Sequence, residues 1–342
     1  MTEQGGVPRH AQQGGMNTVL AIDIGGTHFR LALFDSEGRR LETSEGDTSR
    51  SGGREWMLEQ IRARGRALRA HASPPAAACG ISFGGPVDFR QQRVTSVHSA
   101  GWRDFSFAEW VSSNLNLPCL IDNDGNAGAL GEFRYGGGRG TESLVYVTLS
   151  TGVGAGVILN GKPLRGKDGL AGELGHIPVS SAGTACSCGA RGCLESLSSG
   201  SAIAQRGRER GWRPTPGLAG EAAGDALSRP AGGQPAGITA KEIAQAAARG
   251  DRAALQIMAE AAGWLARGLL TVIRLINPDK IILGGGLTLA GPVLLDPLHQ
   301  SLAQLASPTI GYSTQIGTAE LGLDSPLYGA AALALDLLPA KP

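Results

Sequence analysis

The sequence predicts an α/β protein of two domains with a cleft between them. Its 342 residues are many for one compact domain and suit two. Runs typical of strands alternate with amphipathic stretches typical of helices, a pattern that favours an α/β architecture. A strand, a glycine turn and a returning strand also occur twice, about 125 positions apart. The two halves therefore resemble diverged copies that would face each other.

Composition narrows the classes of partner. The net charge of +1 provides no global field that would attract nucleic acid or an anionic membrane. No stretch approaches the roughly 18 consecutive apolar residues of a membrane-spanning helix, and the N-terminus lacks the apolar core of a signal peptide. We therefore expect a cytoplasmic protein with neither a nucleic-acid nor a membrane partner. The polar, glycine-rich residues 1–16 are predicted to be a disordered extension, with Met16 as an alternative start.

The first predicted hairpin contains a candidate phosphate loop. A buried strand over residues 18–23 ends in the turn Asp23-Ile-Gly-Gly-Thr27, after which a second strand returns. Gly25 and Gly26 would let backbone amides approach phosphate oxygens, and Thr27 would add a hydroxyl donor. Asp23 would hold Mg²⁺ through water. The alternative for this motif alone is an ordinary hairpin turn.

The second predicted hairpin repeats this arrangement. Strands expected over residues 144–149 and 155–159 flank a turn that contains Thr151, Gly152 and Gly154. The hydroxyl and the glycines occupy the matching place in the second half. Two such loops that face each other would grip one phosphate chain from both sides.

A polar cluster at a predicted strand-to-helix junction supplies a candidate catalytic base. The segment Asp122-Asn123-Asp124-Gly-Asn126 places several acceptors together. A lone cluster of this kind is more often a turn or a helix cap. Phosphoryl transfer needs mainly positioned groups, yet one carboxylate must accept the proton of the attacking hydroxyl. Asp124 fits that role, and Asn123 would orient the same substrate through its hydroxyls.

The most specific signal is a group of metal-ligand residues. His176 is followed ten positions later by Cys186, and then by Cys188 and Cys193. One imidazole and three thiolates satisfy tetrahedral Zn²⁺, and four protein ligands close the site, which predicts structural zinc. The alternatives are a disulfide between Cys186 and Cys188, which would be strained and disfavoured in a reducing compartment, or three unrelated thiols.

Two carboxylates flank this cluster. Glu173 lies three residues before His176, and Glu195 two residues after Cys193. If one nitrogen of His176 binds zinc, the other is held in a fixed orientation between these acceptors, which suits a polyol such as a sugar. The alternative is that both are ordinary surface carboxylates.

The C-terminal third begins with a predicted loop and two helices. Between residues 207 and 237 the composition turns to Gly, Pro, Ala and Arg, which predicts a mobile surface loop. Thr239 and Glu242 form a capping box, and Asp251 caps a longer helix. Apolar positions alternate in spacing between three and four along one face of that helix: Leu255, Met258, Ala262, Leu265, Leu269, Val272 and Ile276.

A glycine run follows the next predicted strand. Asn277-Pro278 ends the long helix, and a strand over residues 280–283 leads into Gly284, Gly285 and Gly286. These glycines would leave a flat backbone surface on which an adenine ring lies without side-chain obstruction. Alone this signal is weak, because strand-to-helix turns often use glycine.

Together these motifs resemble the ROK family of sugar kinases, repressors and open reading frames, which belongs to the actin-like ATPase superfamily. The resemblance covers nearly the whole chain and includes two phosphate loops, an Asn-Asp catalytic pair and the Glu-x-Gly-His and cysteine signatures. The matching segments are Asp23 to Thr27, Asn123 with Asp124, Thr148 to Gly154, Glu173 to His176 and Cys186 to Glu195.

The resemblance implies a two-domain actin-like ATPase fold, also called ribonuclease H-like, with an interdomain cleft. Residues 17–128 plus about 325–340 would form the N-terminal α/β domain. Residues 129–324 would form the C-terminal α/β domain, including the zinc loop 176–195. Relatives commonly assemble through the second domain, so a homodimer or homotetramer is expected.

The ligand sets are implied residue by residue. The sugar would be bound by Gly85, Asn123, Asp124, Glu173, His176 and Glu195. ATP with its Mg²⁺ would be bound by Asp23, Gly25, Gly26, Thr27, Thr151, Gly152, Gly154, Gly284, Gly285 and Gly286.

The activity implied is ATP-dependent phosphorylation of a hexose, first of all glucose to glucose 6-phosphate, as in the zinc-containing, glucokinase-like members. N-acetylmannosamine kinase and fructokinase share the same ligands and stay open as alternatives. A non-catalytic sugar-sensing regulator is the alternative of another class. It would have little reason to keep Asp124, and the roughly 17 residues before the first strand are too few for a helix-turn-helix module.

Overall fold

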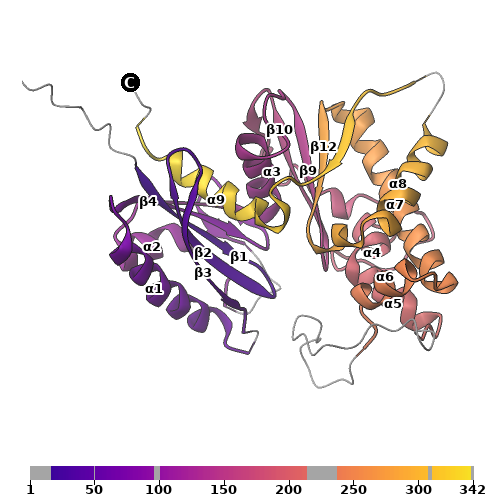
Figure 1. Cartoon of the computed structure of the whole chain (residues 1–342), viewed down its shortest axis with the longest axis horizontal. Coiled ribbons are helices and arrows are strands. Elements are labelled where there is room, and N and C mark those ends of the chain that lie inside the picture. Colours follow the sequence, from indigo (N-terminus) through magenta and orange to yellow (C-terminus); the bar gives the residue numbers. More distant parts are fainter. Residues whose placement is uncertain (1–16, 50, 96–100, 214–236, 307–309, 340–342) are drawn as a thin grey trace, which may run out of the picture.

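In the computed structural model, residues 17–49, 51–95, 101–213, 237–306 and 310–339 are described. Two five-stranded sheets occupy opposite halves of the molecule, and helices α3 (Asp124–Tyr135) and α9 (Ser325–Leu335) lie between them (Figure 1). Each half has its own apolar core. The predicted α/β architecture of two halves is confirmed.

The first sheet consists of β1 (Thr18–Ile24), β2 (His28–Asp35), β3 (Arg40–Asp47), β4 (Ala76–Phe83) and β8 (Cys119–Asn123), in the spatial order β3-β2-β1-β4-β8. The central strand β1 is buried along its whole length, because its apolar run fills both faces of the sheet. β1 pairs antiparallel with β2, as the hairpin predicts, and parallel with β4.

Helices cover both faces of this sheet. On one face, α1 (Gly53–His71) and α2 (Phe107–Leu115) share an apolar core with Leu20 and Ile22 of β1. On the other face, α9 packs on the small residues Ala21, Ala32 and Ala78, which let the helix approach closely. A small sheet of β5 (Val87–Asp88), β6 (Arg93–Val94) and β7 (Phe105–Ser106) adds to this half.

The second sheet consists of β9 (Leu144–Leu149), β10 (Val153–Leu159), β11 (Lys162–Pro163), β12 (Lys280–Gly284) and β13 (Gln315–Thr318), in the spatial order β11-β10-β9-β12-β13. β9 pairs antiparallel with β10 and parallel with β12, as β1 does with β2 and β4. The two sheets therefore share one topology, as expected from the repeated hairpin.

Helices also cover both faces of the second sheet. One face packs against helices of the C-terminal half, and the other against α3, which contributes Ala129 to a core with Tyr146. The helices on the first of these faces are α4 (Leu194–Ser198), α5 (Gly200–Glu209), α6 (Ala240–Ala248), α7 (Arg252–Ile276) and α8 (Pro292–Leu305).

The two helices between the sheets cross at very close range. Gly131 of α3 faces the backbone of α9 so closely that a Cβ there would overlap the carbonyl oxygen of Ser325. A Cβ on Gly329 of α9 would likewise overlap the carbonyl oxygen of Ala127 on α3. Glycine is therefore required at both positions, since any side chain would push the helices apart.

A buried carboxylate fixes the far end of this crossing. Glu132 of α3 is completely buried. Its Oε2 accepts the N–H of Gly137 at 2.8 Å, and its Oε1 accepts the N–H of Leu321 at 3.0 Å and the hydroxyl of Ser325 at 2.7 Å. An unpaired carboxylate in this place would be strongly unfavourable, so these donors hold the end of α3 and the start of α9 together.

The capping residues predicted for α6 and α7 are confirmed. Thr239 and Glu242 form both bonds of a capping box, and the Asp251 side chain accepts the N–H of Ala254 at 2.9 Å. One position of the predicted buried face is wrong, because Leu255 is 40% exposed. It lies in the first turn of α7 and lines a shallow surface hollow beside Pro292 of α8 instead of packing on the sheet.

One boundary differs from the prediction, others lie beyond the described residues, and the division between the two domains stays a prediction. The loop expected from residue 207 begins later, because α5 continues to Glu209, and Gly207 packs inside it against Ile243. Residues 214–236 of that loop and the extension 1–16 lie outside the described residues. The division expected between residues 128 and 129 falls inside α3, so a helix, and no linker, occupies that point.

Among the described residues, no helix combines the length and the apolar character that crossing a bilayer requires.

Substituting Gly329 tests the helix crossing. We expect Gly329→Ala to lower the free energy of unfolding by roughly 1–3 kcal/mol, because the added methyl group forces α3 and α9 apart. The matched control is Gly263→Ala in the middle of α7, where the nearest non-local atom would be 3.8 Å from the new Cβ. That change should be neutral or stabilise by up to about 1 kcal/mol. Equal denaturant midpoints for the two variants would contradict the close crossing.

Candidate active site

Strand β10 is the surface on which two site segments are assembled. The first turn of α3 lies against it, since a Cβ on Gly125 would be 2.5 Å from the carbonyl oxygen of Ala155. The segment before His176 lies against it as well, since a Cβ on Gly172 would be 2.6 Å from the same oxygen. Glycine at both positions therefore allows Asp124 and the Glu173 to His176 turn to approach each other.

Asp124 is the first residue of α3 and is half-buried. The preceding residue, Asn123, caps the helix by accepting the N–H of Asn126 at 2.7 Å. Burial raises the pKa of Asp124 from 3.8 to about 6, and the charges of Asp23 and Glu173 contribute in the same direction. The amides of the helix terminus oppose this shift only partly. The carboxyl group therefore titrates close to neutral pH.

Asp23, at the end of β1, is held by an arginine that the sequence reasoning missed. Arg30 donates to Asp23 Oδ2 at 2.7 Å, to the carbonyl oxygen of Leu323 at 2.8 Å, and to Asp324. Asp23 and Arg30 are direct partners across the β1–β2 hairpin. This cross-strand pairing of opposite charges was the available signal.

The first candidate phosphate loop, at Gly25 to Thr27, presents exposed backbone. Gly26 and Thr27 are exposed, while Gly25 is half-buried and donates its N–H to the carbonyl oxygen of His28 at 2.9 Å. The hydroxyl of Thr48 stabilises the loop by donating to the carbonyl oxygen of Gly25 at 2.9 Å. The loop at Gly84-Gly85, predicted on the sugar side, lies beside it, since the Gly84 N–H donates to the carbonyl oxygen of Ile24 at 2.8 Å.

The second candidate phosphate loop, at Thr151 to Gly154, is hydrogen-bonded to Glu195. The Glu195 Oε2 accepts the N–H of Val153 at 3.1 Å, and a Cβ on Gly152 would lie 2.5 Å from this oxygen. Thr151 is exposed at the tip of the loop, and Gly154 pairs with Thr148 across the hairpin. Glu195 is therefore no isolated surface carboxylate, because it links the cysteine segment to this loop.

The three glycines after β12 differ in exposure. Gly284 is buried, and Tyr146 packs so closely that a Cβ would overlap its hydroxyl oxygen. Gly285 is half-buried and Gly286 is exposed. Gly285 and Gly286 therefore offer more exposed backbone to a ligand than Gly284, and the contact of all three with the nucleotide stays a prediction.

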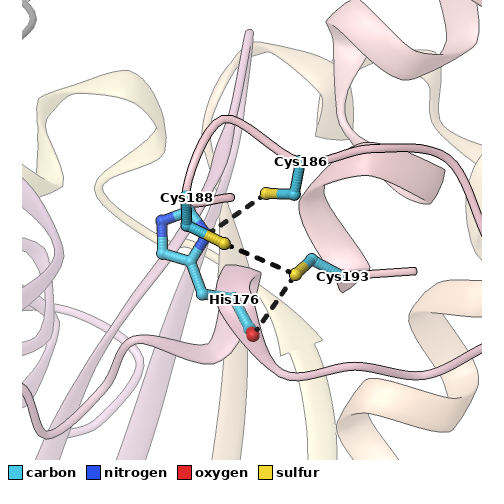
Figure 2. A group of neighbouring side chains, drawn as sticks. All are labelled: His176, Cys186, Cys188 and Cys193. Atoms are coloured by element: carbon cyan, nitrogen blue, oxygen red, sulfur yellow. Dashed lines mark hydrogen bonds between the residues drawn. The ribbon is translucent and has the colours of Figure 1, made fainter. Parts of the chain in front are cut away.

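The four predicted metal ligands converge in one cluster, shown in Figure 2. His176 Nδ1 lies 3.5 Å from Cys186 Sγ, and Cys188 Sγ lies 3.7 Å from Cys193 Sγ. Ideal tetrahedral zinc, with bonds of about 2.3 Å to sulfur and 2.0–2.1 Å to nitrogen, requires separations of about 3.6 Å and 3.8 Å. All four ligand atoms lie within 4.8 Å of one another. Two of the separations therefore match a zinc tetrahedron, and the other ligand atoms lie close enough to share one ion.

The three thiols of the cluster are free. The separation of 3.7 Å between Cys188 and Cys193 excludes a disulfide between them, since bonded sulfurs would be about 2.05 Å apart. Cys186 is free as well, so the alternative disulfide between Cys186 and Cys188 is absent. Burial and the neighbouring Cys188 and Cys186 raise the pKa of Cys193 to about 12, whereas the Ala190 N–H lowers the pKa of Cys188. Cys193 therefore retains its proton unless a metal ion replaces it.

The two ring nitrogens of His176 face different neighbours, one the thiols and the other Glu173. Figure 2 shows Nδ1 on the side of the Cys186 thiol. The other nitrogen, Nε2, lies 3.8 Å from Glu173 Oε2. The predicted orientation is therefore present for Glu173, while Glu195 reaches the second phosphate loop instead. Because the charge of Glu173 also acts on Asp124, the candidate metal site, the flanking carboxylate and the candidate base adjoin one another.

Comparison with known proteins assigns the family. The model of the ROK family matches residues 19–337. The chain belongs to the ROK family. The chain is similar to a crystal structure of a ROK family glucokinase from Streptomyces griseus in complex with glucose and AMPPNP. The sequence identity is 33% and the TM-score is 0.77. The match covers 94% of this chain and 100% of that one, and the predicted actin-like ATPase fold is thereby confirmed.

Two curated relatives that act on different sugars share the same percentage identity with this chain. The glucokinase of Streptomyces coelicolor is 33% identical over 320 residues, covering 93% of this chain and 98% of that protein. The N-acetylmannosamine kinase of Yersinia pestis is 33% identical over 322 residues, covering 92% and 98%. Overall identity to this ROK chain therefore does not discriminate between the two sugars.

The raised pKa of Asp124 predicts a pH-dependent stability difference. Because the folded pKa of about 6 exceeds the unfolded value of 3.8, the folded state binds more protons between them, and stability falls as pH rises from about 4 to 6. Asp124→Asn should therefore unfold at a higher temperature than the wild type at pH 7. The gain should be on the order of 1–3 kcal/mol, at 1.36 kcal/mol per pKa unit.

Thermal unfolding of the ligand-free protein at pH 4, 5, 6 and 7 measures this difference. The matched control is Asp296→Asn, which neutralises an exposed carboxylate on α8. If Asp124→Asn gave the same shift at every pH as the control, the raised pKa would be contradicted.

Proposed function

We propose that this chain is an ATP-dependent hexose kinase that phosphorylates glucose to glucose 6-phosphate, with Asp124 as the general base. The observation that carries the proposal is the position of Asp124. It is a carboxylate with a pKa of about 6 whose charge interacts with Asp23 beside one phosphate loop and with Glu173 beside the metal cluster. The ROK glucokinase relatives support the same reaction.

In the proposed mechanism, Asp124 is charged above about pH 6 and accepts the proton of a sugar hydroxyl. The hydroxyl oxygen forms a bond to the γ-phosphorus while the bond from that phosphorus to the bridging oxygen breaks, and ADP leaves. Asn123, whose side chain caps α3, would hold the same sugar. Gly85, Glu173, His176 and Glu195 would complete the sugar site.

On the nucleotide side, exposed backbone and hydroxyl groups of the two loops would bind the phosphates. The residues proposed for this role are Gly25, Gly26, Thr27, Thr151, Gly152 and Gly154, with Gly285 and Gly286 near the adenine. Mg²⁺ bound with ATP would neutralise phosphate charge. Asp23 would hold it through water, with one carboxylate oxygen already bonded to Arg30 at 2.7 Å.

The sugar is proposed to be glucose, with N-acetylmannosamine and fructose as alternatives. The glucokinase relatives support glucose, but the N-acetylmannosamine kinase is as similar in sequence. A sugar-sensing regulator without activity is disfavoured, because it would not need a base with the raised pKa of Asp124.

Zinc is the metal proposed for the cluster of His176, Cys186, Cys188 and Cys193. Three sulfurs and one nitrogen at tetrahedral separations suit zinc, and four protein ligands leave no open position for a reacting group. The ion would neutralise the thiolates and fix His176, whose Nε2 faces Glu173. The free thiols also agree with a reducing compartment such as the cytoplasm. The homodimer or homotetramer stays a prediction.

The first experiment is an ADP-release assay with Mg·ATP and glucose, mannose, fructose, N-acetylglucosamine or N-acetylmannosamine. We expect glucose to give the highest kcat/KM. Asp124→Asn should lower kcat by about 10² to 10⁴, with glucose binding retained, because only the proton acceptor is lost. In the wild type, kcat should fall as pH drops below about 6, where Asp124 becomes protonated. Glucose binding without turnover of any sugar would favour the regulator instead.

Metal content tests the cluster. Elemental analysis of the wild type should find one zinc per chain, and Cys188→Ser should lose most of it, because three ligands bind less tightly than four. Its KM for glucose should rise as His176 loses its fixed orientation. Cys119→Ser, which changes a thiol outside the cluster, is the matched control and should keep the zinc. Equal zinc in Cys188→Ser and the wild type would refute the four-ligand site.

A further inference from the structure

Arg165 connects the two halves of the molecule beside the candidate base. It follows β11 of the second sheet, and its side chain is 21% exposed. Its Nε and Nη2 donate to Oδ2 of Asp122 at 2.8 Å and 2.7 Å. Asp122 belongs to β8 of the first sheet and its side chain is only 3% exposed. A largely buried ion pair therefore spans the two sheets.

The other carboxylate oxygen of Asp122 is bonded to the start of α3. Its Oδ1 accepts the N–H of Asn123 and the side-chain amide of Asn126, each at 2.9 Å. Asn123 caps the helix whose first residue is Asp124. The position of Asp122 thus influences the orientation of the strand-to-helix junction that carries the base.

Phe89 fixes the plane of the Arg165 guanidinium. The Arg165 Cζ lies 3.6 Å from the centre of the Phe89 ring, which comes from the first half of the chain. The planar group therefore stacks on an aromatic face while two of its nitrogens bond Asp122. A lysine ammonium has no such plane and no fixed pair of donors, so it would reproduce only the charge.

The backbone of Arg165 is bonded to the other sugar-side segment. Its carbonyl oxygen accepts the N–H of Ala171 at 3.1 Å, which closes the loop that leads to Glu173. The next residue, Gly172, lies against Ala155 of β10. One residue thus contacts the segment before Glu173 through its backbone and the segment before Asp124 through its side chain.

We propose that Arg165 is a positioning residue that fixes the Asn123–Asp124 junction and the Glu173 segment relative to each other across the two halves. The effect that this inference predicts on the kinetics rests on the proposed kinase function. Arg165 acts through Asp122 and Ala171 and need not touch the sugar. Its charge also compensates Asp122, a carboxylate whose burial would otherwise disfavour ionisation.

The kinetic test compares Arg165→Met and Arg165→Lys with the wild type. For Arg165→Met, kcat/KM for glucose should fall on the order of 10²-fold while KM for Mg·ATP changes by less than about threefold, because only the sugar-side segments are displaced. Arg165→Lys should recover part of this loss. The matched control is Arg206→Met, which removes a similarly buried arginine paired with Glu260 on the helices away from this junction.

A second variant covers the case in which Arg165→Met leaves Asp122 uncompensated and does not fold. Asp122→Asn combined with Arg165→Met removes both charges, so it restores a neutral, foldable site. We expect the double variant to lose as much kcat/KM for glucose as Arg165→Met alone, because the two residues act as one unit. Wild-type kcat/KM in the folded double variant would overturn the proposal.

Amide hydrogen exchange tests the positioning independently of activity. In the ligand-free double variant, peptides covering residues 120–128 and 168–176 should exchange faster than in the wild type, and in Arg206→Met they should not. A wild type that phosphorylates no sugar would refute the kinase function alone, and the exchange result would still decide the coupling. Unchanged exchange in both segments, or an equal effect in Arg206→Met, would refute the role of Arg165.

Discussion

The close crossing of α3 and α9 is the constraint on which the other features depend. Two helices meet there backbone to backbone, with Gly131 and Gly329 at the contact. Each helix also packs on a different sheet, α9 on the first and α3 on the second. Because α3 begins where β8 of the first sheet ends, its first residue, Asp124, necessarily lies at the junction of the halves.

Several buried carboxylates lie along or near this junction, and each has specific partners. Asp23 is bonded to Arg30, Asp122 to Arg165, and Glu132 to backbone N–H groups and a hydroxyl. Buried ions of this kind contribute little net stability, but removing one partner is strongly unfavourable, so they specify one arrangement of the segments they join. Asp124 is the exception, since burial, together with the charges of Asp23 and Glu173, raises its pKa to about 6.

The sequence was sufficient wherever the signal was local or carried by a spaced motif. The duplicated hairpins, the capping box of Thr239 and the cluster around His176 needed no knowledge of distant contacts, and the structure has all three. Long-range partners were not predictable, because spacing does not say which segments meet. The pairing of Arg165 with Asp122 and the bond of Glu195 to the second phosphate loop are of this kind. Leu255 was misplaced because periodicity does not show where the packing surface ends.

The backbone contacts of the crossing also bear on how such a chain can change over time. A contact between main-chain atoms does not depend on which side chains surround it. The sequences of the two halves can therefore diverge while their topology is kept. At Gly131 and Gly329, however, only glycine fits, since the Cβ of any other residue would overlap a carbonyl oxygen. The structure therefore leaves broad evolutionary freedom on the outer helices and almost none along a narrow path through the centre.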